Sequence, residues 1–157
     1  MQKITPFLWL ENNAEEAMNF YVSIFKNSRV GNVSRYGDAG PGPKGSVMVG
    51  AFTIEGQEFM ALNGGPIYQF TPAFSIYVRC ETQEEVDFYW EKLTADGGKP
   101  GRCGWLVDKF GLSWQIVPNV LGELMGSGDS EKSSRVMQAL LQMDKLNIAD
   151  LERAYAG

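Results

Sequence analysis

A local pattern that occurs twice constrains the fold of this 157-residue chain more than any other feature. Leu8-Trp9-Leu10 is a short apolar strand that leads into a helix carrying Phe20-Tyr21. Ile76-Tyr77-Val78 leads in the same way into a helix carrying Phe88-Tyr89. Because self-similarity of this kind marks a duplicated structural unit, we predict two strand-then-helix modules. Paired modules of this type are expected to build a cleft between them.

Length and composition favour a single domain. The chain is 44% hydrophobic and 21% charged, which is enough for one sizeable core and too little for two independent cores. We predict one domain over residues 1–157, with module one at about 1–65 and module two at about 71–120. The composition changes after the flexible stretch that begins at Gly126, and a helical tail is predicted at about 127–157.

Charge and hydropathy exclude two classes of partner. The formal net charge is −5 and no run of Lys or Arg occurs, which argues against nucleic acid, whose binding requires clustered cations. No stretch approaches the roughly 20 apolar residues of a membrane-spanning helix. We therefore expect a cytoplasmic protein without a membrane partner, in which Cys80 and Cys103 are reduced thiols.

Periodicity and capping signals predict similar elements in both modules. In module one we expect strands at 4–10, 29–36, 46–54 and 58–62, with a helix at 14–25. In module two we expect strands at 74–79, 102–107 and 112–117, with a helix ending near 93. Asn13 with Glu16, and Thr82 with Glu85, have the spacing of capping boxes at the helix starts. The tail is expected to form helices at 134–143 and from Asn147 to about 155.

Three further features are interpreted as structural. The stretch at 40–45 has the glycine spacing GxGxxG, but it leads into a predicted strand and offers no helix N-terminus for a phosphate, so we predict a connecting loop. The acidic pairs Glu15-Glu16 and Glu84-Glu85 lie in first helical turns, where they favour the helix dipole. Glu58 and Asp108 adjoin turns and are expected to be solvated charges.

Several stretches resemble the PhnB-like family, also labelled 3-demethylubiquinone 3-methyltransferase-like. They are residues 4–10, 14–17, 20–21, 42–48, 61–66, 80–82 and 108–118, and the resemblance is taken to include the tail. The family belongs to the glyoxalase/bleomycin-resistance, or vicinal oxygen chelate, superfamily. The resemblance implies an α+β fold of two βαβββ modules with C-terminal helices. It does not imply one reaction, because the superfamily includes isomerases, dioxygenases, transferases and drug-sequestering proteins.

The resemblance also implies four positions where metal-dependent relatives carry ligands. In this chain they correspond to Thr5, a position near Phe59, Ala73 or Phe74, and Gln115. The chain contains no histidine, and hydroxyl or amide oxygens bind transition metals weakly. We therefore expect no metal site and no cofactor. Nucleophile arrangements that need an imidazole base are excluded for the same reason.

The residues expected to line the cleft are mainly aromatic. Alternation along the first strand places Thr5, Phe7 and Trp9 on one face, which should point into the cleft because Thr5 matches a superfamily ligand position. Further candidates for the ligand-binding set are Phe52, Phe59, Asn63, Trp105 and Gln115. For these five residues a role in the core is the alternative.

Three functions remain open from the sequence. The leading hypothesis is a metal-independent protein that binds a small hydrophobic or aromatic molecule and forms a homodimer. The alternative is a superfamily enzyme, such as a lyase, dioxygenase or transferase, that uses Gln115, Glu58 or a backbone carbonyl with a weakly bound cation. The third is a scaffold whose dimer surface, including the tail stripe at Leu140 and Leu141, is its function; the other role for that stripe is packing on its own domain.

Overall fold

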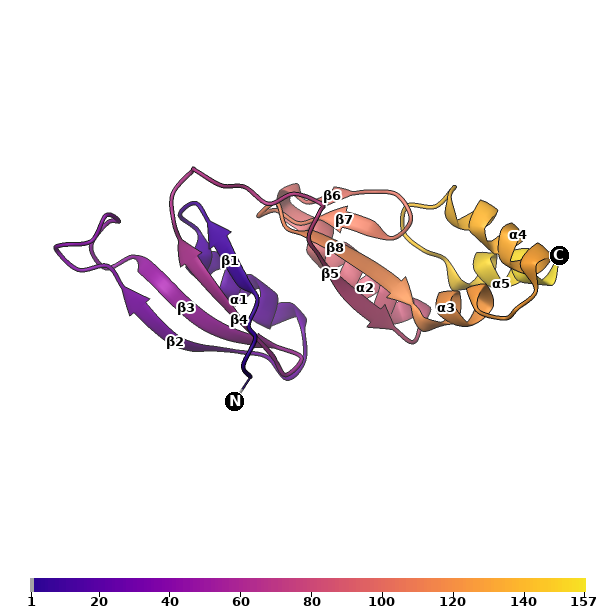
Figure 1. Ribbon diagram of the computed structural model, residues 1–157, viewed down its shortest axis with the longest axis horizontal. Coiled ribbons are helices and arrows are strands. Elements are labelled where there is room, and N and C mark those ends of the chain that lie inside the picture. Colours follow the sequence, from indigo (N-terminus) through magenta and orange to yellow (C-terminus); the bar gives the residue numbers. More distant parts are fainter. Residues whose placement is uncertain (1) are drawn as a thin grey trace. The chain divides into compact units, whose positions relative to one another are not determined.

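A four-stranded sheet covered by one helix is built twice along the chain (Figure 1). The computed structural model describes residues 2–157. It divides into a first unit, Met1–Phe70, and a second unit, Thr71–Gly157. The single-domain organisation stays a prediction.

The first unit consists of β1 (Phe7–Leu10), α1 (Ala14–Ile24), β2 (Arg29–Arg35), β3 (Val47–Ile54) and β4 (Gln57–Asn63). Its strand order is β1-β4-β3-β2, with β1 parallel to β4 and the other pairs antiparallel. The turn between β3 and β4 has positive φ at both Glu55 and Gly56, as a tight two-residue hairpin requires. The strand, helix and hairpin predicted for module one are therefore confirmed, apart from end positions.

The second unit repeats this order. It consists of β5 (Ser75–Cys80), α2 (Gln83–Thr94), a 3-10 turn (Ala95–Gly97), β6 (Lys99–Pro100), β7 (Trp105–Val107) and β8 (Ser113–Pro118). The strand order is β5-β8-β7-β6, and β5 is again parallel to β8. The two-residue strand β6 has no counterpart among the predicted elements, and it completes the second βαβββ module. The predicted α+β fold of two such modules is confirmed.

The core of the first unit lies between its sheet and α1. Tyr21 of α1 stacks on Phe52 with ring centroids 6.1 Å apart, and Phe52 stacks on Phe59 at 5.4 Å. All three side chains are buried. Gly50 lets the helix approach closely, because a Cβ there would lie 2.7 Å from Cε of Met18. Helix α1 therefore covers one face of the sheet and leaves the other without a helix.

The start of α1 differs from the sequence prediction. The Asn13 side chain makes no capping hydrogen bond, so the predicted Asn13/Glu16 capping box is wrong. Instead Oδ1 of Asn63, at the end of β4, accepts from the Ala14 amide at 2.8 Å, while Nδ2 donates to the Val47 carbonyl at 3.0 Å. A residue distant in sequence thus satisfies a helix-end donor, and local spacing contains no trace of it.

Two other helix starts agree with the sequence, whereas the tail helix predicted at 134–143 starts four residues earlier, at Ser130, and ends at Leu140. At α2 the Thr82 hydroxyl accepts from the Glu85 amide at 3.2 Å, and the Glu85 carboxylate accepts from the Glu81 amide at 3.2 Å. At the last helix Asn147 accepts from the Asp150 amide at 2.9 Å. Both caps were predicted from spacing alone.

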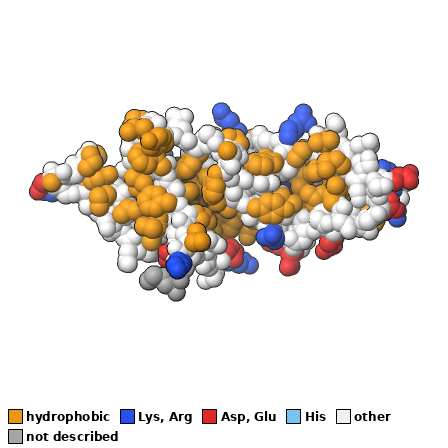
Figure 2. All heavy atoms as spheres, viewed as in Figure 1, with side chains coloured by type: hydrophobic (Ala, Val, Ile, Leu, Met, Phe, Trp, Pro, Cys, Tyr) orange, Lys and Arg blue, Asp and Glu red, His pale blue; other side chains and the backbone are white. Residues whose placement is uncertain are grey.

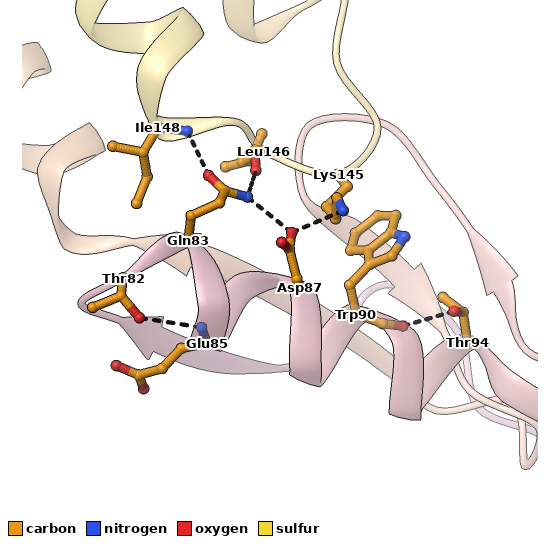
Figure 3. A network of polar contacts seen from close by, with 9 residues as sticks. All are labelled: Thr82, Gln83, Glu85, Asp87, Trp90, Thr94, Lys145, Leu146 and Ile148. Atoms are coloured by element: carbon orange, nitrogen blue, oxygen red, sulfur yellow. Dashed lines mark hydrogen bonds and ion pairs between the residues drawn. The ribbon is translucent and has the colours of Figure 1, made fainter.

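The C-terminal tail forms α3 (Asn119–Met125), α4 (Ser130–Leu140) and α5 (Ile148–Ala156). Helix α3 was not predicted. Gln83 of α2 joins the tail to the sheet unit, because its Nε2 donates to the Leu146 carbonyl at 3.0 Å and its Oε1 accepts from the Ile148 amide at 2.8 Å (Figure 3). Lys145 pairs with Asp87 at 2.8 Å, which lowers the pKa of that carboxyl. The tail therefore packs on its own unit.

Both cysteines are free thiols. Cys80 is completely buried at the end of β5, and burial, with a smaller effect of the Glu85 charge, raises its pKa to about 12. Cys103 is half-buried beside the Leu140 carbonyl. No helix among residues 2–157 combines the length and hydropathy that crossing a bilayer would need.

Candidate functional site

The first unit has a sheet face that α1 does not cover, which we call the first face. Side chains alternate along a strand, and directly paired residues of adjacent strands lie on the same side, so the register assigns them. The first face consists of Phe7, Trp9, Arg29, Ser34, Val49, Ala51, Thr53, Glu58, Met60 and Leu62. Phe7 is half exposed. Hydrophobic side chains gather over the strands of this unit (Figure 2).

Trp9 is held firmly on the first face. Its Nε1 donates to the Gly65 carbonyl at 3.0 Å, and the Tyr68 ring meets it edge-on with centroids 5.0 Å apart. The turn after β4 lies directly against the indole, because a Cβ at Gly64 would be 2.3 Å from two indole carbons. An aromatic wall with a fixed orientation follows, of the kind that small-molecule sites use.

We expect Gly64→Ala to displace the Trp9 indole. The added methyl group has no room, and overpacking of this kind should lower the free energy of unfolding by about 1–3 kcal/mol. Urea unfolding and the tryptophan emission maximum measure both effects. Gly37→Ala is the matched control, because nothing lies within 4 Å of its Cβ position. Equal stability of the two variants would contradict the described packing of Trp9.

The second unit has a corresponding face that α2 does not cover, the second face, although Ser113 and Val117 on it are buried. It consists of Ser75, Tyr77, Arg79, Lys99, Trp105, Val107, Ser113, Gln115 and Val117. Tyr77, Gln115 and Trp105 form one row across β5, β8 and β7. Nε2 of Gln115 donates to the Ser75 hydroxyl at 3.0 Å, and the Arg79 guanidinium lies 5.5 Å from the centroid of the Tyr77 ring. Aromatic rings, an amide and a cation therefore share this face.

The eight predicted ligand-binding residues fall into three groups. Phe7 and Trp9 lie on the first face, and Thr5, which precedes β1, has the same strand parity. Trp105 and Gln115 are direct partners on the second face. The others are Phe52 and Phe59, which are 1% and 6% exposed beneath α1, and Asn63, which caps α1. For these three the structure gives a role in the core or the helix cap.

Sequence reasoning missed Tyr77 and Arg79 as site residues. The repeat did contain a signal for Tyr77, because Leu8-Trp9-Leu10 matches Ile76-Tyr77-Val78 and so equates Tyr77 with Trp9. The structure bears out that equivalence: Trp9 pairs with Leu62, and Tyr77 pairs with Gln115. Tyr68, which contacts Trp9, lies in a linker without periodicity and carried no such signal.

A cavity of about 260 Å³ lies at the carboxyl end of β1 in the first unit. It is lined by Glu11, Asn12, Tyr36, Pro41, Gly42, Pro43, Ser46, Asn63, Gly64 and Gly65. One wall is thus the Gly64-Gly65 turn that also holds Trp9. The Tyr36 hydroxyl donates to the Asn63 carbonyl at 2.8 Å and closes the inner end.

The glycine spacing at 40–45 has a packing explanation. A Cβ would come within 2.5 Å of the Tyr36 ring at Gly40 and within 2.4 Å at Gly42, so both glycines allow the loop to wrap this ring. The loop then enters β3 and no helix begins there. It therefore lacks the helix N-terminus on which a dinucleotide or S-adenosylmethionine loop depends.

The donor atoms at the four family ligand positions do not fit a transition metal. Phe59 lies in the core, Phe74 offers an aromatic ring, and the Gln115 amide is bonded to Ser75. Thr5 contributes a hydroxyl only. Among residues 2–157, Cys, Asp and Glu form no group of three that could surround an ion. Hydroxyl and amide oxygens are weak ligands for such metals.

Asp108 is not the solvated charge that the sequence predicted. It is 2% exposed, and its Oδ2 accepts from Nε1 of the buried Trp114 at 2.8 Å. Its Oδ1 accepts from the amides of Phe110 at 2.8 Å and Leu112 at 3.1 Å. The carboxylate therefore fixes the turn between β7 and β8 on the α2 side of the sheet. That prediction was wrong because adjacency to a turn does not reveal which way a side chain points.

A family model and several solved structures match most of this chain. A family model described as 3-demethylubiquinone-9 3-methyltransferase matches residues 2–117. The solved PhnB protein from Bacillus cereus is 45% identical, with a TM-score of 0.70, over 74% of this chain and 99% of that chain. A Pseudomonas aeruginosa protein is 20% identical, with a TM-score of 0.62, over 75% of this chain and 98% of that one.

A more distant structure shares the fold alone. The fosfomycin resistance protein FosX from Listeria monocytogenes, solved with Mn(II) and sulfate, is 18% identical with a TM-score of 0.55, over 81% of this chain and 98% of that chain. A comparison with curated proteins gives no match. The family model ends before α3, so the expected extension of the family match over the tail is not met. The chain belongs to the PhnB-like 3-demethylubiquinone-9 3-methyltransferase family.

Proposed function

We propose that this protein binds a small hydrophobic or aromatic molecule without the help of a metal ion. The observation that carries the proposal is the fixed position of Trp9, between its hydrogen bond to Gly65 and its edge contact with Tyr68. A rigid aromatic wall costs little conformational entropy when a ligand binds, because its rotamer is already set. The neighbouring cavity of about 260 Å³ offers additional room for a small molecule.

Two activities suggested by the relatives find little support in the residues of this chain. FosX was solved with Mn(II), whereas the four family ligand positions inferred from the resemblance offer a hydroxyl at Thr5, an amide at Gln115 and, beside Phe59, the single carboxylate of Glu58. The family description names a methyltransferase, but the glycine loop at 40–45 packs around Tyr36 and enters a strand. A binding function requires neither a metal nor a methyl donor.

The proposal predicts a saturable fluorescence response to N-phenyl-1-naphthylamine, a neutral aromatic probe. We expect Trp9→Ala to raise its dissociation constant about tenfold, because loss of an aromatic contact and its buried area is worth about 1–2 kcal/mol. Trp90→Ala, on the outer helix α2, is the matched control and should leave the constant within about twofold. Circular dichroism verifies that each variant is folded.

The same titration with a chelator separates binding from metal chemistry. We expect the dissociation constant to be unchanged by EDTA. Binding that disappears with EDTA and returns with Mg²⁺ or Mn²⁺ would contradict the proposal and favour the enzyme alternative, in which Gln115, Glu58 or a backbone carbonyl holds a weakly bound cation. The absence of any saturable probe binding would contradict it as well.

We also propose that the protein forms a homodimer. Several large apolar side chains are exposed, including Ile4, Phe7, Ile67 and Tyr68 in the first unit. Large exposed apolar side chains are a common feature of interaction surfaces when they form one patch. Size-exclusion chromatography with light scattering tests this directly, and a monomer at all concentrations up to about 100 μM would contradict it, because interfaces of standard size bind more tightly than that.

A further inference from the structure

The second face carries only positive charges, whereas the first face carries charges of both signs. We infer that it selects aromatic ligands that carry an anionic group, such as an aryl carboxylate or sulfonate, with Arg79 as the residue that recognises the anion. This inference rests on the proposed binding of a small aromatic molecule, but it concerns a different face from the one that carries Trp9. It is derived from the second unit alone.

The row of Tyr77, Gln115 and Trp105 supplies the aromatic part of this recognition. Gln115 of β8 pairs directly with Tyr77 of β5 on one side and with Trp105 of β7 on the other. Adjacent strands are about 4.8 Å apart, so the two aromatic side chains rise from the sheet roughly 10 Å from each other. That separation allows a planar ring to lie over the Gln115 amide with a ring on either side.

Gln115, between the two aromatic residues, and the neighbouring Ser75 supply the polar groups of this face. Nε2 of Gln115 uses one hydrogen for the Ser75 hydroxyl at 3.0 Å, and this bond fixes the orientation of the amide. An amide has two donor hydrogens and one acceptor oxygen. Gln115 can therefore still donate to, or accept from, a polar substituent of a ligand that lies above it.

Arg79 lies two positions after Tyr77 on the same face of β5. Its guanidinium sits 5.5 Å from the centroid of the Tyr77 ring, a cation–π distance that holds the charged group beside one end of the aromatic row. The side chain is exposed, so no burial of the charge has to be compensated. Guanidinium groups match planar carboxylates and sulfonates through paired N–H donors, which makes Arg79 suited to the anion.

The remaining charges of the second face have the same sign. Lys99 of β6 has the parity of Val107 and Ser113 and so belongs to this face. Within the described strands β5 to β8, no residue on the second face is acidic. The first face, in contrast, carries both Arg29 and Glu58. A positive face on a chain of net charge −5 attracts anions locally, whereas the whole molecule repels them.

A pair of matched probes tests the inference. 8-Anilinonaphthalene-1-sulfonate and N-phenyl-1-naphthylamine share one aromatic skeleton and differ only in the sulfonate. We expect Arg79→Gln to raise the dissociation constant of the sulfonate probe about tenfold at low salt, the usual size of a charge-assisted contact, and to change that of the neutral probe less than about twofold. Added salt should weaken binding of the sulfonate probe to the unaltered protein, because salt screens the attraction between Arg79 and the sulfonate. It should have little effect on the neutral probe, or on the sulfonate probe with Arg79→Gln.

Lys92→Gln is the matched control. It removes one positive charge from the same unit, and its ammonium also lies over an aromatic ring, 5.8 Å from that of Phe88, but on the exposed side of α2. We expect it to leave both probes unaffected. Arg79→Lys should keep part of the preference, because the charge is retained and the paired donors are lost.

The possible outcomes separate this inference from the function on which it rests. If the neutral probe binds but Arg79→Gln leaves the sulfonate probe unchanged, or weakens both probes equally, the choice of an anionic ligand is overturned while the binding function survives. If neither probe binds, both fail. If Lys92→Gln matches the effect of Arg79→Gln, the preference comes from net charge alone and Arg79 is not the recognising residue.

Discussion

We expect Asp108→Ala to lower the free energy of unfolding by about 3–5 kcal/mol, the largest effect of any substitution considered for this protein. The carboxylate is 2% exposed and accepts hydrogen bonds from the Trp114 indole and the amides of Phe110 and Leu112. Its removal leaves buried donors without an acceptor, and each such donor costs about 1–3 kcal/mol. Urea unfolding followed by tryptophan fluorescence measures the change.

Two variants show which part of this contact matters. Asp108→Asn keeps an acceptor for the backbone amides but presents an NH₂ group or a neutral oxygen to the indole N–H, so an intermediate loss is expected. Trp114→Phe removes the indole donor while most of the buried ring volume stays. If Asp108→Ala is no more destabilising than substitution of an exposed acid such as Glu131, the described turn is wrong.

The second large effect is expected at the junction of the tail with the second unit. Leu146→Ala should lower the free energy of unfolding by about 2–5 kcal/mol, because the side chain is completely buried and a cavity would remain. Leu146 lies against Gly104, where a Cβ would already be 3.2 Å from its side chain. Chemical denaturation provides the measurement.

Leu141→Ala is the matched control for this substitution. The same atoms are removed from the same tail, but Leu141 is 53% exposed, so the change should be within about 0.5 kcal/mol. Equal effects of the two variants would contradict the packing of the tail on its own unit. If Leu141→Ala leaves stability unchanged and shifts the dimer–monomer equilibrium, the tail stripe contributes to the dimer contact.

Elements governed by local rules were predictable from the sequence. The repeat correctly indicated two modules with the same strand order, because each copy contains a similar strand and helix start. Thr82 and Asn147 cap their helices as the spacing predicted. Alternation correctly placed Phe7 and Trp9 on the face opposite to Leu8 and Leu10. These signals depend only on residues within a few positions of each other.

Features that depend on distant residues could not be predicted in this way. Asn63 replaces Asn13 as the cap of α1 because the end of β4 lies beside that helix start, which no local pattern encodes. Residue type alone does not distinguish Phe52 and Phe59 from Trp9, because all three are aromatic. Only the pairing register shows that the two phenylalanines lie under α1. The second face was only half recognised for the same reason: Tyr77 and Arg79 become neighbours of Gln115 only once β5 pairs with β8.

Native mass spectrometry of the freshly purified protein, before and after treatment with EDTA, tests the central claim most directly. It reports the mass of every bound species together with that of the assembly. Metal-independent binding predicts a small organic adduct, or an added aromatic probe, that stays bound at the same occupancy after EDTA. A stoichiometric divalent ion whose removal also releases the organic molecule would contradict it, because binding of the organic molecule would then depend on a metal ion.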